Sequence, residues 1–390
     1  MSVQTVSLGC RLNFAETETI ARSAPADEDW IVVNSCAVTN EAVRQTRQAI
    51  RSAHRNRPDA KILVTGCAAE LDSAAFADMA GVSRVVGNAN KLNSFAANDV
   101  MTPSGMLANV KSFVAVQTGC NHRCTFCSIW QARGPSLSLP FEAIRDAVGR
   151  EIDRGAKEIV LTGVDITDYG GGLGKLCQGL LAAEPRLKRL RLSSLDSIEI
   201  DDALFELIAA EPRLMPHFHL SLQAGDDMIL KRMKRRHSRA DAVRTVKRIK
   251  AARADASIGA DLIAGFPTET EEMALNSLKI LDDCDIVATH IFPFSPRPST
   301  PAARMPQLER ELVKARAARL RDAAASRRER WLQRFVGTTQ PMLVEGNGVG
   351  HTDNFAPVAL AGAARGQAGQ ARITGFDGNR LTADLAGQRA

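Results

Sequence analysis

Residues 120–127 read CNHRCTFC, so that Cys120, Cys124 and Cys127 are spaced as CxxxCxxC. The run follows an apolar stretch, Phe113–Gln117, that is expected to be a strand. Thiolates at this density select zinc or an iron–sulfur cluster. A structural zinc site would take His122 as its fourth ligand, although closely spaced CxxC pairs are the more usual zinc pattern. Three cysteines around a four-iron cluster leave one iron open to a substrate or cofactor.

Downstream of this run the chain alternates between apolar stretches and helical stretches. The expected strands are Phe113–Gln117, Glu158–Thr162, Lys188–Ser193, His217–Leu222, Ser257–Leu262 and Asp285–Phe292. Six β/α units predict a partial or complete β/α barrel, whose chemistry lies at the carboxyl ends of the strands. Polar and glycine residues follow these strands, as in Thr162-Gly-Val-Asp165 and Ala264-Gly-Phe-Pro267.

Upstream of the run, the first hundred residues predict a small, mainly parallel α/β sheet. Its expected strands are Val3–Leu8, Trp30–Val33, Lys61–Thr65 and Arg84–Val86, and Asn40–Arg57 is expected to be a helix. Cys10, Cys36 and Cys67 each come just after one of the first three strands. These could be three unrelated buried thiols, but their common position at the ligand-binding edge of an open sheet favours one site.

The length and composition indicate several globular domains. At roughly 150 residues per domain, 390 residues correspond to two or three domains, and 45% hydrophobic with 24% charged residues excludes a mainly disordered chain. We read residues 93–112 as a linker and Gln307–Phe335 as one long helix; short strand-like runs after Gly337 predict a small β domain. The predicted fold class is α/β, with domains at 1–100, 108–330 and 331–390.

The cysteine count and the charge bear on location and partners. The N-terminus has no basic segment followed by an apolar run, and no stretch of eighteen apolar residues occurs, so we expect a cytoplasmic protein without a membrane span. Eight cysteines then indicate a metal or redox function rather than disulfides. Cys177 and Cys284 are interpreted as structural residues. A net charge of +6 permits an anionic partner without requiring one.

The first cysteine run resembles that of the radical S-adenosylmethionine (SAM) enzymes. The resemblance rests on CxxxCxxC with an aromatic residue, Phe126, before the last cysteine, at the end of the first of six β/α units. It implies that Cys120, Cys124 and Cys127 hold a catalytic 4Fe–4S cluster whose open iron binds SAM. It also implies cofactor contacts by Phe126, Thr162, Gly163, Asp165, Ser194, Gln223, Ile263 and Gly265.

The whole chain resembles the methylthiotransferases within that superfamily. An upstream α/β domain with three cysteines, a radical core with a partial (β/α)6 barrel and a C-terminal β domain of the type called TRAM together carry this resemblance. It implies that Cys10, Cys36 and Cys67 hold a second, auxiliary 4Fe–4S cluster that delivers sulfur. One SAM molecule then supplies the radical and another the methyl group. Flavodoxin or ferredoxin is the expected electron donor, and a monomer is expected.

Three segments resemble the line that modifies threonylcarbamoyladenosine at position 37 of tRNA. They are Leu8–Asn13 (LGCRLN), Cys36–Asn40 (CAVTN) and Phe292–Arg297 (FPFSPR). The sequence departs from that line in Ser128–Gly134 (SIWQARG) and at Ser35, where Thr is usual. The alternatives are methylthiolation of isopentenyladenosine in tRNA or of a ribosomal protein aspartate. A zinc-stabilised RNA-binding protein is an alternative of a different class.

Basic residues give independent support for an RNA partner. We expect phosphate contacts from a basic run and from the end of the long helix, at Lys231, Arg232, Lys234, Arg235, Arg236, Arg327 and Arg328. The C-terminal β domain has few aromatic residues and therefore offers a thin stacking platform for RNA. A target base in the anticodon loop fits a deep barrel mouth, because loop bases unstack at modest cost.

Overall fold

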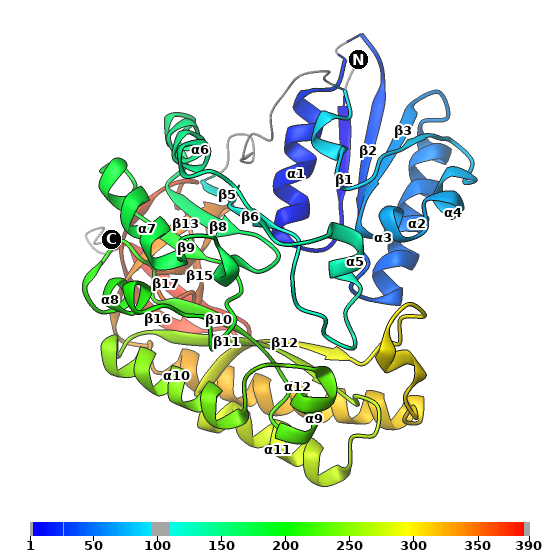
Figure 1. Ribbon diagram of the computed structural model, residues 1–390. Coiled ribbons are helices and arrows are strands. Elements are labelled where there is room, and N and C mark those ends of the chain that lie inside the picture. Colours follow the sequence, from blue (N-terminus) through cyan, green and yellow to red (C-terminus); the bar gives the residue numbers. More distant parts are fainter. Residues whose placement is uncertain (1–2, 26, 96–109, 386–390) are drawn as a thin grey trace.

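A computed structural model describes residues 3–25, 27–95 and 110–385. It shows three regions, and the central one is built on a curved sheet (Figure 1). The α/β fold class predicted from the sequence is confirmed. Most of the predicted linker, 93–112, and the predicted boundaries at residues 100 and 108 lie outside the described residues. No helix in the described ranges is long and apolar enough to cross a membrane.

The N-terminal region is a four-stranded parallel sheet. Its strands lie in chain order, β1 (Val3–Ser7), β2 (Trp30–Ser35), β3 (Lys61–Gly66) and β4 (Val82–Val85). The helices between them are α1 (Arg11–Arg22), α2 (Asn40–Asn56), α3 (Cys67–Leu71) and α4 (Ser73–Ala77). Alternate side chains of β2 and β3 enter two separate apolar clusters, which shows that the sheet is covered on both faces.

Six parallel strands form the central curved sheet. β5 (Lys111–Ala115), β8 (Glu158–Thr162) and β9 (Leu190–Leu192) make one half, and β10 (His217–Gln223), β11 (Ser257–Ala264) and β12 (Ile286–Pro293) make the other. Isolated bridges from Leu190 to Leu214 and from Leu195 to Leu220 join the halves. The result is the partial (β/α)6 barrel expected from the sequence, and a short hairpin of β6 (Gln117–Thr118) and β7 (Leu137–Ser138) follows β5.

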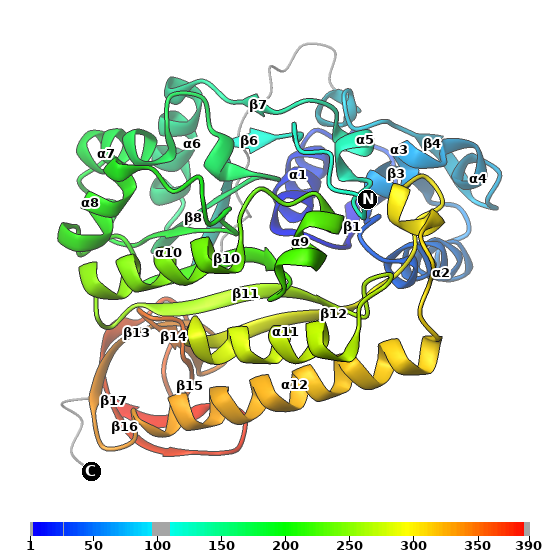
Figure 2. The same ribbon diagram turned by 60° about the horizontal axis from the view of Figure 1, so that its bottom comes forward.

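Helices cover the outside of this barrel, and polar side chains line its inner face. The outer layer consists of α6 (Phe141–Asp153), α7 (Leu173–Ala183), α8 (Asp202–Ala210), α10 (Arg239–Ala252), α11 (Glu271–Asp283) and α12 (Arg310–Gln333). Figure 2 shows α11 and α12 running along β11 and β12. Alternate strand residues such as Leu220 and Leu262 pack against this layer, so the residues between them, such as His219 and Asp261, face inward.

The C-terminal region is a closed five-stranded barrel. Its strands are β13 (Thr339–Gly346), β14 (Val349–Thr352), β15 (Pro357–Leu360), β16 (Ala368–Phe376) and β17 (Leu381–Leu385). β14 was not among the predicted strands, because its four residues VGHT lack an apolar alternation. A side chain at Gly350 would lie 1.9 Å from the carbonyl oxygen of Leu343, so close approach of β13 and β14 requires glycine there.

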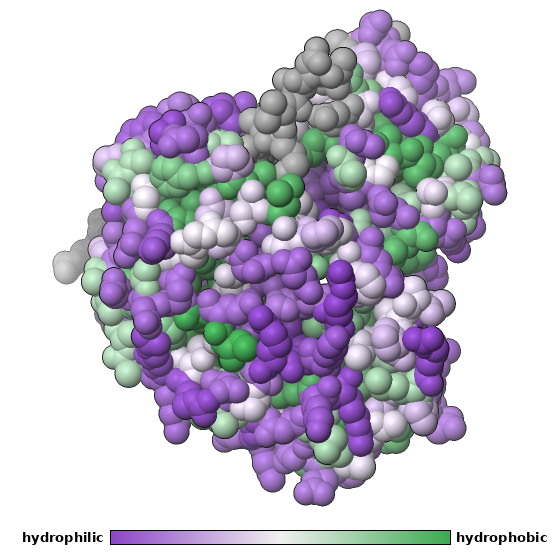
Figure 3. All heavy atoms as spheres, in the orientation of Figure 1, coloured by the Kyte–Doolittle hydropathy of each residue, from purple (hydrophilic) through white to green (hydrophobic). Residues whose placement is uncertain are grey.

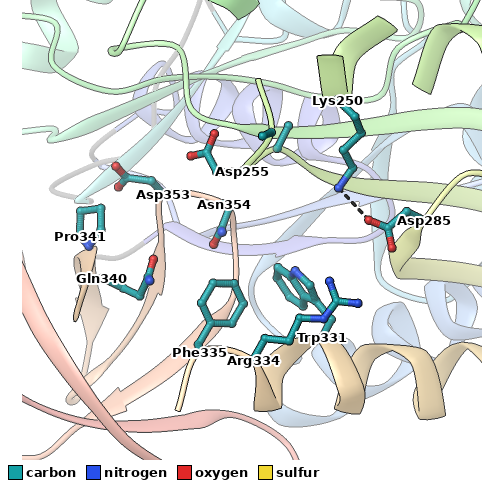
Figure 4. Close-up of a pocket in the computed structure, with 12 residues that line it drawn as sticks. Lys250, Asp255, Asp285, Trp331, Arg334, Phe335, Gln340, Pro341, Asp353 and Asn354 are labelled. Atoms are coloured by element: carbon teal, nitrogen blue, oxygen red, sulfur yellow. Dashed lines mark hydrogen bonds and ion pairs between the residues drawn. The ribbon is translucent and has the colours of Figure 1, made fainter. Parts of the chain in front are cut away.

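This small barrel packs against the amino-terminal ends of the central strands. Ser257 Oγ donates to the carbonyl oxygen of Asn354 at 2.6 Å, and the ring of Phe355 stacks on His217 at 4.8 Å. A pocket of about 280 Å³ remains at this junction, lined by Trp331, Phe335 and ten other residues (Figure 4). The C-terminal region therefore covers one end of the central barrel. The N-terminal region lies at the other end, where the central strands have their carboxyl ends.

Candidate active site between two cysteine triads

The predicted radical SAM triad lies on a loop that is fixed on both sides. Cys120, Cys124 and Cys127 come between β6 and α5 (Ile129–Arg133). The Cys120 N–H donates to the carbonyl oxygen of Gly134 at 3.1 Å. On the other side, Thr125 bonds to the backbone of Arg232 and Met233 in α9 (Asp227–Met233), at 2.7 and 3.0 Å. The backbone contacts thus hold the loop before any cofactor binds.

The second triad is gathered from three turns of the N-terminal sheet. Cys10 caps α1, Cys36 follows β2 and Cys67 begins α3. Gly9 has φ +95°, and a side chain there would lie 2.6 Å from Cys36 Sγ, so a glycine lets the first two turns approach. Burial, with a smaller contribution from the nearby thiols of Cys10 and Cys67, raises the pKa of Cys36 to about 11.

Two polar side chains join the turns that carry this second triad. Asn13 Nδ2 donates to the carbonyl oxygens of Leu8 and Ser35, at 2.8 and 3.0 Å, and so connects the turns of Cys10 and Cys36. Ser35 Oγ donates to the carbonyl oxygen of Thr65 at 2.6 Å and accepts the N–H of Ala69 at 3.0 Å, which connects the turn of Cys67. The departure from Thr at position 35 therefore keeps the hydroxyl that these bonds use.

The two triads lie beside each other across the boundary between the N-terminal sheet and the central barrel. Burial, with smaller contributions from the thiols of Cys124 and Cys67, raises the pKa of Cys127 to about 11, so a thiol from the other triad is among its electrostatic neighbours. Arg133 of α5 reaches across the same boundary, and its Nε–H donates to Cys67 Sγ at 3.3 Å. The structure thus brings six of the eight cysteines into one region.

A buried charge cluster holds Arg133 in place. Its guanidinium bonds to both carboxylate oxygens of Glu16, at 2.8 and 2.9 Å, and to Asn13 Oδ1 at 2.6 Å. Lys91 Nζ contacts the same carboxylate at 2.5 Å. Burial alone would raise the pKa of Glu16, but Arg133 and Lys91 hold it at about 2. This role of Arg133 was not predicted from the sequence, although the residue lies within the SIWQARG segment.

The cations near the thiols, and the spacing of the thiols themselves, fit anionic iron–sulfur clusters. Arg235 Nη1 lies 3.8 Å from Cys124 Sγ. Arg297 is buried and electrostatically coupled to Cys36, and its Nε and Nη2 atoms have no hydrogen-bond partner among the described residues. Sulfides of a cluster held by Cys36 would be acceptors for these atoms. The donor set therefore fits two clusters with three thiolate ligands each.

The zinc alternative fits this geometry less well. Tetrahedral zinc, with Zn–S bonds of about 2.3 Å, holds its ligand sulfurs about 3.8 Å apart. Within the described part of the chain, neither triad brings its three sulfurs within 4.8 Å of one another. His122 Nε2 instead pairs with Asp165 at 2.8 Å, and its bonds to Asp165 and Glu199 raise its pKa to about 10. The ligand atoms of Cys120, His122 and Asp165 do lie within 4.8 Å of one another, but this group includes only one of the three cysteines of the triad.

The structure places the predicted cofactor contacts at the carboxyl ends of four neighbouring strands. Thr162 ends β8, and Gly163 and Asp165 follow it, where Gln117 Oε1 accepts the N–H groups of Val164 and Asp165 at 3.0 and 2.9 Å. Phe126 and Ile263 meet in one apolar cluster. The remaining three predicted contacts, at the ends of β9, β10 and β11, are Ser194, Gln223 and Gly265. Gly265 faces Val313 of α12, at 2.8 Å from where its side chain would begin.

The basic run around α9 does not form one solvent-exposed surface. Lys234 has φ 60°, which reverses the chain after α9. Arg235 consequently points inward and pairs with Asp196 at 2.9 Å. Arg236 pairs with Glu199, and Arg232 donates to the carbonyl oxygen of Thr268 at 3.1 Å.

Only part of the predicted RNA-contact set remains available to an outside partner. Arg327 pairs with Asp282 and Asp285. Lys231, Lys234 and Arg328 are exposed, and their side chains make no ion pair or hydrogen bond within the described ranges. Figure 3 shows hydrophilic side chains gathered near the centre of this face, over α9 and the adjacent strand ends.

The comparisons with known sequences cover both cysteine triads. Residues 114–281 match the radical SAM superfamily, and residues 2–87 match the family described as "Uncharacterized protein family UPF0004". A Rickettsia prowazekii protein named threonylcarbamoyladenosine tRNA methylthiotransferase is 43% identical, over 92% of this chain and 91% of its own length. A Thermotoga maritima protein of that name is 32% identical, over 88% and 86%. An Erythrobacter litoralis tRNA-2-methylthio-N(6)-dimethylallyladenosine synthase is also 32% identical, over 88% and 86%.

Solved structures give the same fold at low identity. The radical SAM methyltransferase TsrM from Kitasatospora setae superposes with a TM-score of 0.55 at 14% identity, over 71% of this chain and 67% of that one. This likeness concerns the fold alone. The sequence relatives, each aligned over most of both chains, carry the assignment. The chain belongs to the radical SAM methylthiotransferase family, and it is most similar there to the threonylcarbamoyladenosine tRNA line.

Proposed function

We propose that this enzyme inserts sulfur and a methyl group at C2 of N6-threonylcarbamoyladenosine at position 37 of tRNA. The proposal is supported most directly by the two cysteine triads, which lie side by side at the carboxyl ends of the barrel strands with Arg133 between them. Support for the substrate comes from the relatives with that name, one of them 43% identical over most of the chain.

The reaction needs two thiolate sites because the C2–H bond of adenine is not acidic enough for any side chain to remove its proton. When bound, one 4Fe–4S cluster with SAM supplies a radical for hydrogen abstraction, and the second cluster with another SAM supplies sulfur and methyl. We assign the first cluster to Cys120, Cys124 and Cys127. We assign the second, auxiliary cluster to Cys10, Cys36 and Cys67.

Several protein groups position these sites. Arg133 contacts the second triad from the loop of the first, so it fixes the separation and orientation of the two sites. Arg235 places a positive charge beside Cys124, which stabilises an anionic cluster. Gln117 holds the backbone after β8, where we propose that the amino group of SAM binds.

The three segments of this chain that resemble the threonylcarbamoyladenosine line meet in the structure. Arg297 Nη1 donates to Asn40 Oδ1 at 2.6 Å, which links FPFSPR to CAVTN. Asn13 of LGCRLN links the turns of Cys10 and Cys36. Segments far apart in the sequence thus surround one place, as expected if all three shape one substrate site.

The second candidate is the same chemistry on isopentenyladenosine, which is favoured by the 32% identity to a dimethylallyladenosine synthase. We propose further that a flavodoxin or ferredoxin supplies electrons, that the enzyme is a monomer, and that it acts in the cytoplasm, where its tRNA substrate is found. We also propose that the anticodon loop enters the barrel mouth near the exposed Lys231 and Lys234.

Nucleoside analysis of tRNA from a strain that lacks the gene tests the substrate. The account predicts that 2-methylthio-threonylcarbamoyladenosine disappears, unmodified threonylcarbamoyladenosine accumulates, and a plasmid copy restores the product. A Cys36→Ala copy should not restore it. Loss of 2-methylthio-isopentenyladenosine instead would select the second candidate.

A further inference from the structure

The inner face of the central barrel carries a band of charged side chains whose carboxylates are already paired. Glu158 contacts Lys111, Arg189 and Arg191, at 3.3, 3.0 and 2.9 Å. Asp261 Oδ1 accepts ring N–H groups from His219 and His290, at 3.0 and 2.9 Å. The contacts of Glu158 link β5, β8 and β9 in one half of the barrel, and those of Asp261 link β10, β11 and β12 in the other half.

Glu345 of the C-terminal barrel belongs to the same band and is also paired. It contacts Lys111 at 2.7 Å and His351 at 2.7 Å. Each of the carboxylates Glu158, Asp261 and Glu345 therefore already has at least two partners in direct contact.

Arg11 is a cation in this band without such a partner. It is the first residue of α1, directly after Cys10, and its guanidinium lies over the ring of Phe113 in β5 at 5.6 Å. It is partly buried and electrostatically coupled to Arg191, Glu158, Glu345 and Asp261. Within the described residues it makes no ion pair and no hydrogen bond. Its five N–H donors are thus directed into the barrel without an acceptor.

A partly buried guanidinium without an acceptor is a receptor for an anion. A planar guanidinium binds a carboxylate through two parallel hydrogen bonds, and the position over Phe113 limits its orientation. The threonylcarbamoyl group ends in a carboxylate, whereas the dimethylallyl group is an uncharged hydrocarbon.

We propose that Arg11 binds the carboxylate of the threonylcarbamoyl group and thereby selects this substrate over adenosines with uncharged side chains. The inference rests on the proposed function. Arg11 adjoins Cys10, so a side chain bound there belongs to a base whose ring lies near the sulfur-delivering triad. Arg11 is thus assigned as a specificity-determining residue, and the two histidines held by Asp261 line the same inner face.

The test compares two anticodon stem-loop RNAs that differ in the charge of one group and by one methyl group. One carries threonylcarbamoyladenosine, and the other carries its methyl ester, which has nearly the same shape without the negative charge. Wild-type enzyme, Arg11→Met and Arg11→Lys are reconstituted with iron and sulfide, and methylthiolation is measured as kcat/KM. Arg51→Met is the matched control, because Arg51 is an exposed arginine of α2 with no ion pair or hydrogen bond in the described structure.

Wild-type enzyme should prefer the acid over the ester by about 10- to 100-fold, as expected for loss of a charge-assisted contact. Arg11→Met should remove this preference and change kcat/KM for the ester by less than about threefold. Arg11→Lys should keep part of the preference, and Arg51→Met should keep all of it. Iron content and RNA-independent cleavage of SAM should be unchanged in each variant.

Equal loss of activity on the acid and the ester, or no preference in the wild type, would overturn the role of Arg11. If Arg11→Met loses iron because Arg11 adjoins Cys10, the role of Arg11 is decided by the ratio of kcat/KM on the acid and the ester, measured for Arg11→Lys and for the wild-type enzyme. Wild-type enzyme that is active on isopentenyladenosine RNA and inactive on both other RNAs would instead overturn the proposed function itself.

Discussion

Arg133 and Glu16 form the single contact on which the spacing of the two triads most depends. Both side chains are almost fully buried, with 2% and 8% of their area exposed, and Lys91 completes the cluster. Two cations around one carboxylate leave a positive charge, and Arg133 directs it at the thiol of Cys67. A thiolate or an anionic cluster there would complete the charge balance of the site.

Replacing this carboxylate should produce a pH-dependent loss of stability. The folded pKa of Glu16, about 2, lies below the ordinary 4.5, so its ionised form stabilises the fold above pH 4.5 and this contribution is lost as the pH falls toward 2. Glu16→Gln should therefore lower the free energy of unfolding by about 3 kcal/mol at pH 7, with a smaller difference in acid. Urea unfolding of iron-free protein across this pH range measures the effect.

Glu41→Gln is the matched control for that measurement. Glu41 pairs with Arg44 on the exposed face of α2, where solvent screens such pairs and they contribute little to stability. Equal effects of Glu16→Gln and Glu41→Gln would show that the buried cluster does not stabilise the fold.

The six cysteines assigned to clusters should separate into two functional sets. Reconstituted enzyme should contain roughly eight irons per chain if both triads hold four-iron clusters. Cys36→Ala should lose about half of the iron and all sulfur insertion, while SAM is still cleaved to 5′-deoxyadenosine. Cys120→Ala should lose cleavage. Cys284→Ala, a buried cysteine outside both triads, should lose neither, and loss of cleavage in Cys36→Ala would contradict the division.

At the scale of elements, the strands of both parallel sheets were predictable, because buried parallel strands read as short apolar runs. β8 has the predicted bounds, and β1, β3 and β10 differ from them by one residue. β4 begins two residues earlier than predicted, since its edge position leaves Ser83 and Arg84 exposed. The position of all six cysteines after strand ends followed directly from these strands.

Contacts between distant elements could not be predicted from local patterns. Nothing in SIWQARG indicates that Arg133 meets Glu16, since the contact depends on how the N-terminal sheet packs against the loop after β6. The directions of the side chains in the basic run could not be predicted for a similar reason. Its side chains diverge because Lys234 adopts a left-handed conformation, which local charge does not encode.

The exposed lysines of α9 should contribute to tRNA binding, and the buried arginine next to them should not do so directly. A Lys231→Ala and Lys234→Ala double variant should reduce the slope of log Kd against log salt by about 2, because two phosphate contacts are lost. Filter binding at several salt concentrations measures this slope. Lys247→Ala on α10 is the control, and an unchanged slope in the double variant would remove α9 from the proposed RNA surface.

At the scale of the whole molecule, two smaller regions cover opposite ends of one barrel. The N-terminal sheet brings its cysteines to the carboxyl ends of the strands, and the C-terminal barrel covers the amino-terminal ends through Asn354 and Phe355. We propose that the three regions are domains at 1–100, 108–330 and 331–390.

Glu158 connects the central barrel to that C-terminal region. Its buried carboxylate pairs with Lys111, which reaches Glu345, and with Arg189, which also pairs with Asp353. Glu158→Ala leaves these cations without their shared partner and should destabilise the protein by about 3–5 kcal/mol. Thermal unfolding should show a fall of several degrees in Tm, whereas Glu272→Ala on the exposed face of α11 should change Tm little.

The most direct test of the central claim is the product formed by reconstituted enzyme on tRNA that carries threonylcarbamoyladenosine. With SAM and a reductant, mass spectrometry of the digested tRNA should show the 2-methylthio nucleoside. Each product molecule should be accompanied by one 5′-deoxyadenosine and one S-adenosylhomocysteine. Cleavage of SAM without any methylthio product on this tRNA, from enzyme that contains both clusters, would contradict the account.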